Sequence, residues 1–266
     1  MASILDEIFA AKRAEVRAQR ATVTPAAIAA AAVRAPAPRP FVDSLRALRP
    51  AIIAEVKRAS PSKGDILPGL DPAAVARDYA AAGAAAISVL TDRHFKGSLE
   101  DLRAVREAVD LPLLRKDFIF DPYQLYEARA AGADCILLIA AMLKEGELRS
   151  LAALARELKM AALIEVHDGD EFALAEKVDA ELIGINNRDL HTFKTDIATT
   201  ETLMSGYDGD ALIVSESGIE TPADIARLSA AGARGFLVGE SLLRGGAPRA
   251  ALAALTAAGG GNSARK

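Results

Sequence analysis

Cysteine, tryptophan and histidine are all scarce: the 266 residues include one cysteine, no tryptophan and three histidines. A lone thiol, Cys135, excludes an internal disulfide framework and a clustered-thiol metal site. The histidines show no metal-ligand spacing, so we expect no bound metal. No apolar run reaches the roughly 18–20 residues that a membrane span requires.

A large excess of charge of one sign is also missing. The 32 basic and 36 acidic side chains give a formal net charge of −4, which argues against a general binder of nucleic acid or anionic membranes but leaves room for a local basic pocket. The first residues carry acids where a secretion signal would carry bases. We therefore expect a cytoplasmic protein without nucleic-acid or membrane partners, and the sequence leaves protein partners open.

The first fifty residues differ from the rest. Apolar residues recur at helical spacing between Ile8 and Val16, and prolines then punctuate a linker that leads to a second short helix. We expect residues 1–50 to form a helical extension packed on the main domain. The main domain is expected over 51–258, and a glycine-rich, flexible tail over 259–266.

One sequence unit occurs three times in the main domain. Each copy begins with a capping side chain followed by proline and ends in Ala-Ala-Gly-Ala, which is typical of a helix with its start and stop signals. An apolar run follows each copy. The copies span 71–84, 121–133 and 221–233.

Eight apolar runs have the length and character of strands buried on both faces of a parallel sheet. They span 52–57, 87–90, 113–116, 135–140, 163–166, 182–186, 212–215 and 236–238. Eight strands separated by helix-length segments predict a single (β/α)8 TIM barrel of the α/β class, with an open doubly wound sheet as the lesser alternative. No Gly-x-Gly-x-x-Gly follows the first run, which weakens the dinucleotide-binding version of that alternative.

Polar side chains gather at the carboxyl ends of these strands, where barrel enzymes build their active sites. Glu55 and Lys57 share one parity of the first strand, so both are expected to point into the barrel mouth. A single charged residue at a strand end is usually just solvated. Five strands ending this way favour a site for a charged ligand instead. The residues concerned are Glu55, Lys57, Lys116, Glu165, Asn186, Arg188 and Glu216.

Serine and glycine follow the first, seventh and eighth strands. Loops after the last two strands commonly hold phosphate in this fold through backbone N–H groups, so Gly218 and Gly239 are read as phosphate ligands rather than as ordinary turn glycines. Of the three histidines, His167 follows the fifth strand, and we expect it to line the rim of the barrel mouth. We expect Cys135 to lie in the core.

Five motifs, in order along essentially the whole chain, resemble the indole-3-glycerol phosphate synthase family. They are Ile53–Gly64, which resembles the family signature, and then Leu114–Phe118, Ile183–Leu190, Val214–Ile219 and Val238–Leu242. The resemblance includes the N-terminal helical extension of that family. It implies a phosphorylated anilino-sugar substrate, 1-(2-carboxyphenylamino)-1-deoxyribulose 5-phosphate, and the products indole-3-glycerol phosphate, carbon dioxide and water, with no cofactor.

The resemblance also implies roles for residues. Lys116 would be the general acid, with a pKa tuned by burial and neighbours, and Glu165 the general base of the dehydration. Lys57 would hold the substrate carboxylate and assist proton transfer to the leaving hydroxyl. The other implied catalytic residues, Glu55, Asn186 and Glu216, would position hydroxyls and the lysines.

The remaining implied residues bind substrate. Phe95 and Phe118 would flank the anthranilate ring and hold it over the sugar carbonyl. The ligand's polar groups, including the phosphate, would be held by Ser60, Arg188, Ser217, Gly218, Gly239 and Glu240, with the last two acting through backbone N–H groups.

Two alternatives stay open at this point. Another phosphosugar barrel, such as phosphoribosylanthranilate isomerase or the α subunit of tryptophan synthase, would share the phosphate loops but lack two strand-end lysines matched with Glu55 and Glu165. A non-catalytic barrel that binds a phosphorylated metabolite would need those loops but no matched acid and base.

Overall fold

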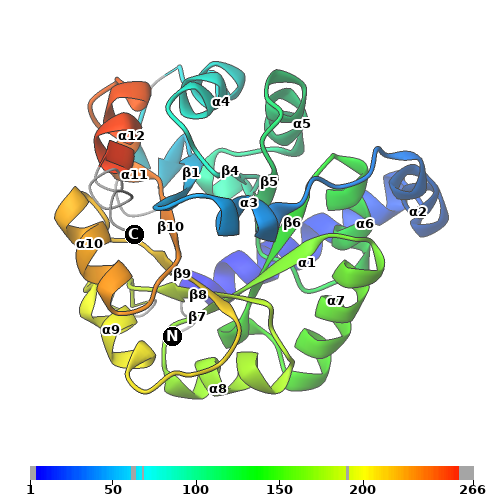
Figure 1. Cartoon of the computed structure of the whole chain (residues 1–266). Coiled ribbons are helices and arrows are strands. Elements are labelled where there is room, and N and C mark those ends of the chain that lie inside the picture. Colours follow the sequence, from blue (N-terminus) through cyan, green and yellow to red (C-terminus); the bar gives the residue numbers. More distant parts are fainter. Residues whose placement is uncertain (1–3, 61–63, 68, 190–191, 258–266) are drawn as a thin grey trace.

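A computed structural model describes residues 4–60, 64–67, 69–189 and 192–257. Eight parallel strands close into a barrel in the order β1-β10-β9-β8-β7-β6-β5-β4, and helices surround it (Figure 1). The strands are β1 (Ala51–Val56), β4 (Ala86–Leu90), β5 (Leu113–Lys116), β6 (Cys135–Ile139), β7 (Ala161–Val166), β8 (Leu182–Asn186), β9 (Leu212–Glu216) and β10 (Gly235–Val238). The predicted TIM barrel is confirmed.

Helices connect successive strands, as parallel pairing requires, and α11 (Glu240–Leu243) and α12 (Pro248–Thr256) follow the last strand. The connecting helices are α4 (Pro72–Ala81), α5 (Leu99–Ala108), α6 (Pro122–Ala130), α7 (Glu145–Glu157), α8 (Gly169–Lys177), α9 (Ala198–Met204) and α10 (Pro222–Ala230), with short 3-10 turns η1 (Arg93–Phe95) and η2 (Ala140–Met142). The three sequence copies form α4, α6 and α10. Their first residues, Asp71, Asp121 and Thr221, each accept a backbone N–H bond at the helix start.

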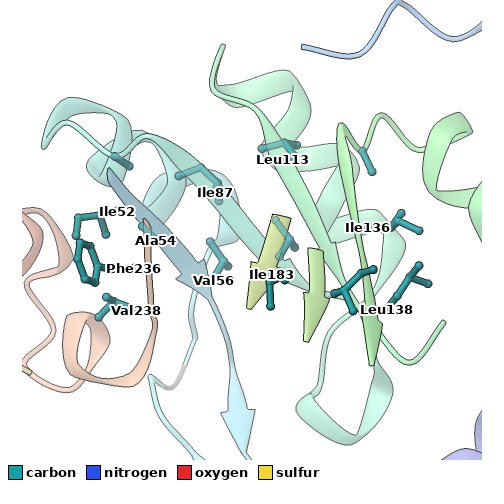
Figure 2. Packing of buried hydrophobic residues seen from close by; sticks show 14 of the residues in the cluster. Ile52, Ala54, Val56, Ile87, Leu113, Ile136, Leu138, Ile183, Phe236 and Val238 are labelled. Carbon is teal, nitrogen blue, oxygen red and sulfur yellow. The ribbon is translucent and has the colours of Figure 1, made fainter. Parts of the chain in front are cut away.

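Alternate residues of each strand belong to two separate apolar layers. One layer lies between the strands and the helices and contains Ile52, Ala54 and Val56 of β1 (Figure 2). The other fills the barrel interior and contains Ile53 of β1 and the fully buried Cys135 of β6. Because both faces of the strands are buried, the sequence shows continuous apolar runs rather than alternation.

Three helices precede the barrel: α1 (Ile4–Thr22), α2 (Pro25–Arg34) and α3 (Phe41–Ala47). Side chains of α3 belong to the interior apolar layer, so this helix closes the floor of the barrel. Helix α2 packs on α6. In Figure 1, α3 lies in front of the strands and α1 crosses behind them, where Phe9 packs edge-on against Phe120, with ring centroids 4.8 Å apart.

One helix and one pair of short strands were not predicted. Helix α2 begins at a recognisable signal, because the Thr24 hydroxyl accepts a bond from the Ala27 N–H and proline follows at the first helical position. A short antiparallel pair, β2 (Ala59–Ser60) and β3 (Gly64–Asp65), follows β1. We keep the division into an extension, a barrel and a tail as a proposal, and the predicted tail at 259–266 lies outside the described residues. No helix within the described ranges has the length and apolar character needed to cross a membrane.

Candidate active site

A cavity of about 380 Å³ opens at the carboxyl ends of the barrel strands, a volume within the range of small-molecule sites. It brings together all but one of the residues predicted to form the site. The lining includes Glu55, Lys57, Phe95, Lys116, Phe118, Glu165, Asn186, Arg188, Glu216, Ser217, Gly218, Gly239 and Glu240. The exception is Ser60, whose side chain lies outside the described part of the chain.

Lys116, the last residue of β5, lies between two glutamates. Its Nζ is 2.8 Å from Glu165 Oε2 and 3.1 Å from Glu216 Oε2. Burial alone would lower the pKa of this ammonium, but the charges of Glu165, Glu216 and Glu55 outweigh burial and raise it. The neighbours therefore tune the pKa of Lys116 upward, and the side chain carries a proton at neutral pH.

Glu165 of β7 is held from three sides. Besides Lys116, the Asn186 Nδ2 donates to its Oε1 over 3.2 Å, and His167 Nε2 lies 3.3 Å from the same oxygen. Burial would raise the pKa of this carboxyl, but the Lys116 charge and the contact with His167 lower it below its ordinary value. Glu165 is therefore a carboxylate at neutral pH.

Glu216, the last residue of β9, is also buried, but its surroundings stabilise the ionised carboxylate less than those of Glu165 do. Burial and the nearby Glu165 charge together outweigh Lys116 and raise its pKa to about 7. Its Oε1 lies against the backbone of Gly184 on β8, where any Cβ would overlap that oxygen. Sequence reasoning missed this requirement for glycine: Gly184 lies in the motif Ile183–Leu190, but periodicity does not show that Glu216 needs the space beside it.

Glu55 and Lys57 form a second pair on the other side of the mouth, with Lys57 Nζ 2.8 Å from Glu55 Oε1. The Tyr79 hydroxyl donates to the Glu55 backbone carbonyl over 3.2 Å. A Cβ at Gly239 would overlap Glu55 Oε1. Close packing against Glu55 is therefore one physical reason for glycine at 239, in addition to the predicted approach to an anion.

The loops after β9 and β10 meet at one end of the cavity. Ser217 and Gly218 both have left-handed backbones, with φ of 66° and 77°, and a Cβ at Gly218 would press on the Thr195 side chain. Gly239 precedes α11, and the Ser241 hydroxyl donates to the Ile219 carbonyl over 2.9 Å, which joins the two loops. The carboxylate of Glu240 accepts from Arg244 over 2.9 Å, and the role of its backbone N–H stays a prediction.

An aromatic pair and an arginine complete the lining. The ring centroids of Phe95 and Phe118 are 6.4 Å apart, with their planes tilted by 32°. The Arg188 backbone N–H donates to Asn186 Oδ1 over 3.0 Å. This contact fixes both the turn after β8 and the amide that reaches Glu165.

The expectation that His167 lines the rim is wrong. It is not among the residues that line the cavity, and it lies behind Glu165 with its Nδ1 3.0 Å from Glu171 Oε2. Burial would lower its pKa, but the contacts of its ring with the Glu165 and Glu171 carboxylates raise it to about 10. The sequence could have indicated this pairing through the spacing Glu165-x-His167-x-x-x-Glu171, because it places Glu171 in the first turn of α8, close to His167.

Sequence reasoning also missed a buried ionic cluster beside the aromatic pair. Lys12 of α1 contacts Asp92 and Asp117, which follow β4 and β5 and line the cavity. No pattern in the sequence links position 12 to these strand ends. Among the described residues, no group of three or more His, Cys, Asp or Glu side chains is placed to hold a metal ion.

The fold and this site define a (β/α)8-barrel enzyme whose mouth joins lysines, carboxylates and two backbone loops suited to an anion. The chain belongs to the indole-3-glycerol phosphate synthase family, whose model matches residues 5–255. That family consists of carboxy-lyases of tryptophan biosynthesis and acts on a phosphorylated substrate. This family assignment argues against both alternatives that the sequence left open, another phosphosugar barrel and a non-catalytic barrel.

Relatives of this name cover nearly the whole chain. The enzyme of Acidithiobacillus ferrooxidans is 49% identical over 95% of this chain and 98% of its own. The enzyme of Albidiferax ferrireducens is 48% identical over 97% of this chain and 99% of its own. Among solved structures, N-acetylmannosamine-6-phosphate 2-epimerase from Clostridium perfringens aligns with a TM-score of 0.61 at 16% identity, over 76% of this chain and 91% of that one. 3-Hexulose-6-phosphate synthase also aligns with a TM-score of 0.61 at 16% identity, over 78% of this chain and 99% of that one. At this identity the structural matches show the fold alone.

Proposed function

We propose that this chain converts 1-(2-carboxyphenylamino)-1-deoxyribulose 5-phosphate into indole-3-glycerol phosphate, carbon dioxide and water. The observation that carries the proposal is that Lys57, Lys116 and Glu165 line one small cavity, with Lys116 and Glu165 in direct contact. An acid and a base within hydrogen-bond reach, beside a second cation, suit a reaction that needs both in succession.

Substrate binding follows from the charges of the lining. The loops that carry Ser217, Gly218, Gly239 and Glu240, together with Ser60, hold the phosphate and neighbouring polar groups. Lys57 and Arg188 supply positive charge for the substrate carboxylate and hydroxyls. Phe95 and Phe118 flank the anthranilate ring, so that its carboxylate-bearing carbon lies over the sugar carbonyl.

In the first step, that ring carbon attacks the sugar carbonyl and forms the new carbon–carbon bond. The carbonyl oxygen takes a proton from Lys116, whose raised pKa keeps the proton in place until negative charge develops on the oxygen. The bond to the carboxylate then breaks, carbon dioxide leaves, and its electrons return to the iminium nitrogen. This internal electron sink removes the need for a cofactor.

In the second step, the hydroxyl formed by ring closure leaves as water with a proton from Lys57. Glu165 takes the proton that the adjacent ring methylene gives up, and the indole becomes aromatic. Glu165 can pass that proton to Lys116 across their 2.8 Å contact. Lys57 is reprotonated from solvent, so each turnover consumes one proton. Glu55, Asn186 and Glu216 position these groups and the substrate hydroxyls.

The direct test supplies the anilino-sugar phosphate to the purified chain and follows indole fluorescence. The chain has no tryptophan, so the protein background at indole wavelengths is low. We expect steady product formation from this substrate and none from phosphoribosylanthranilate. Turnover of the latter alone would favour an isomerase, and tight binding without any turnover would favour a non-catalytic barrel. A cytoplasmic location is part of the proposal, and no protein partner is proposed.

A further inference from the structure

Lys12 is a buried cation that the reaction does not use. Its side chain is 1% exposed, although it lies on the N-terminal helix outside the barrel. Its Nζ is 2.7 Å from Asp92 Oδ2, 2.9 Å from Asp117 Oδ1 and 3.2 Å from Glu15 Oε1. The two aspartates are 0% and 1% exposed. A buried charge is costly unless it is paired, so this arrangement calls for an explanation beyond surface attachment.

Each aspartate holds one of the aromatic residues of the cavity. Asp92 caps η1: its carboxylate accepts from the His94 N–H over 2.8 Å, and its carbonyl accepts from the Phe95 N–H over 3.1 Å. Asp117 accepts from the Phe118 N–H over 2.8 Å. One ammonium group therefore joins the two segments that carry Phe95 and Phe118.

Asp117 has further partners, whereas Asp92 depends more on Lys12. Asp117 also accepts from Thr91 Oγ1 over 2.6 Å and from Arg115 over 3.0 Å. The other side-chain contact of Asp92 in the described structure is the His94 ring, 2.8 Å away. Without Lys12, two buried carboxylates would face each other across the gap between the aromatic loops, and repulsion would move them apart.

The attachment of α1 does not itself require this charge. At its carboxyl end, Arg20 pairs with Asp121 at the start of α6, and Phe9 packs on Phe120. One turn before Lys12, Ile8 lines the cavity. Lys12 thus sets where α1 meets the mouth, while other contacts keep the helix on the barrel.

On the basis of the function proposed above, we propose that Lys12 is a positioning residue for the ring subsite: by bridging Asp92 and Asp117 it fixes the separation of Phe95 and Phe118. The N-terminal helix is then part of the substrate site rather than only a support for the barrel. The ring must lie over the sugar carbonyl for attack, and misplacement of reacting groups by about 1 Å can reduce rates about 100-fold.

The test compares Lys12→Met, which keeps the length of the side chain without its charge, with Arg20→Met, which removes a different ion pair between the same helix and the barrel. At a temperature where both variants are folded, we expect Lys12→Met to raise KM and lower kcat, with kcat/KM reduced about 100-fold. Arg20→Met should keep both constants within about twofold, since an exposed ion pair contributes little. Lys12→Arg should recover part of the loss because it restores the cation.

A binding measurement separates this inference from the proposed function. The probe is the substrate analogue whose carbonyl is reduced to an alcohol, followed by the fluorescence of its anthranilate ring. Weaker binding by Lys12→Met than by the wild-type chain supports the inference. If Lys12→Met does not fold, the double variant Lys12→Met with Asp92→Asn removes the uncompensated charge and should show the same loss.

Suppose that the wild-type enzyme is active and that the Lys12 variants keep its kinetic constants and its affinity for the analogue. That result would overturn the inference and leave the proposed function intact. Equal losses in Lys12→Met and Arg20→Met would also overturn it, because they would indicate a general effect of loosening α1. A wild-type chain that neither binds the analogue nor forms product would refute the proposed function, and the inference with it.

Discussion

Two buried glutamates share the ammonium group of Lys116, and the three side chains do not titrate alike. Glu165 is kept ionised by Lys116 and His167, whereas the pKa of Glu216 is raised to about 7. Environments that push the pKa values of two like groups apart are typical of sites that separate acid and base roles. At the scale of single residues, this asymmetry supports Glu165 as the base and Glu216 as a positioning group.

Replacement of Lys116 tests the proposed acid. In Lys116→Ala we expect kcat to fall by about 10² to 10⁴, the usual contribution of a general acid, while affinity for the reduced analogue changes only a few-fold. Glu216 can take up a proton when its cation is removed, because its pKa is already about 7, so the site is not left with two bare charges. Single-turnover kinetics and analogue titration measure the two effects. Retained turnover would refute the assignment of the acid.

Replacement of His167 tests the charge behind Glu165. The folded-state pKa of His167 is raised from 6.5 to about 10, so its stabilising contribution is complete below pH 6.5 and is lost as the pH rises through 10. Each pKa unit corresponds to about 1.4 kcal/mol, which makes the loss several kcal/mol. Denaturant unfolding across this pH window should show a steeper decline for the wild type than for His167→Gln. Parallel pH profiles would contradict the shift.

At the scale of elements, the sequence predicts the barrel well because each strand and each repeated helix has its own local signal. Continuous apolar runs identify the strands, and the Asp/Thr-Pro starts identify α4, α6 and α10. Helix α2 was missed because its ten residues are mostly alanine, which gives helix propensity without an apolar stripe. The β2–β3 pair is too short for any periodicity to register.

Helix α3 closes the end of the barrel opposite the active site, so it should matter for stability and not for substrate. Leu45 is fully buried in the interior apolar layer. We expect Leu45→Ala to lower the free energy of unfolding by about 2–5 kcal/mol and to leave KM and kcat near wild-type values. Chemical denaturation and steady-state kinetics provide the measurements. A large change in KM with little change in stability would place α3 in the wrong role.

At the scale of the whole molecule, the candidate site is only partly readable from the sequence. Strand ends converge on one face of any parallel barrel, so Lys57, Lys116 and Glu165 could be placed together in advance. The pairing of Lys12 with Asp92 and Asp117 could not, because it joins residues far apart in the chain through the packing of α1. Gly184 likewise owes its role to a neighbouring strand.

The whole barrel also supplies the last prediction, because the proposed phosphate loops follow β9 and β10, whereas the proposed acid and base lie within β5 and β7, near their carboxyl ends. A ligand that binds only the folded chain stabilises it by about 2.7 kcal/mol at 100 times its Kd. For a domain of this size that corresponds to a rise in Tm of about 5–10 °C. We expect indole-3-glycerol phosphate to give such a rise, and Lys116→Ala to retain it.

Indole-3-glycerol without its phosphate is the matched control ligand. If the loops around Gly218 and Gly239 hold the phosphate, the control should leave Tm almost unchanged at the same concentration, in the wild type and in Lys116→Ala alike. An equal rise with both ligands would mean that the ring subsite alone carries affinity. The phosphate would then contribute no affinity, and the two glycines would serve only the packing of Thr195 and Glu55.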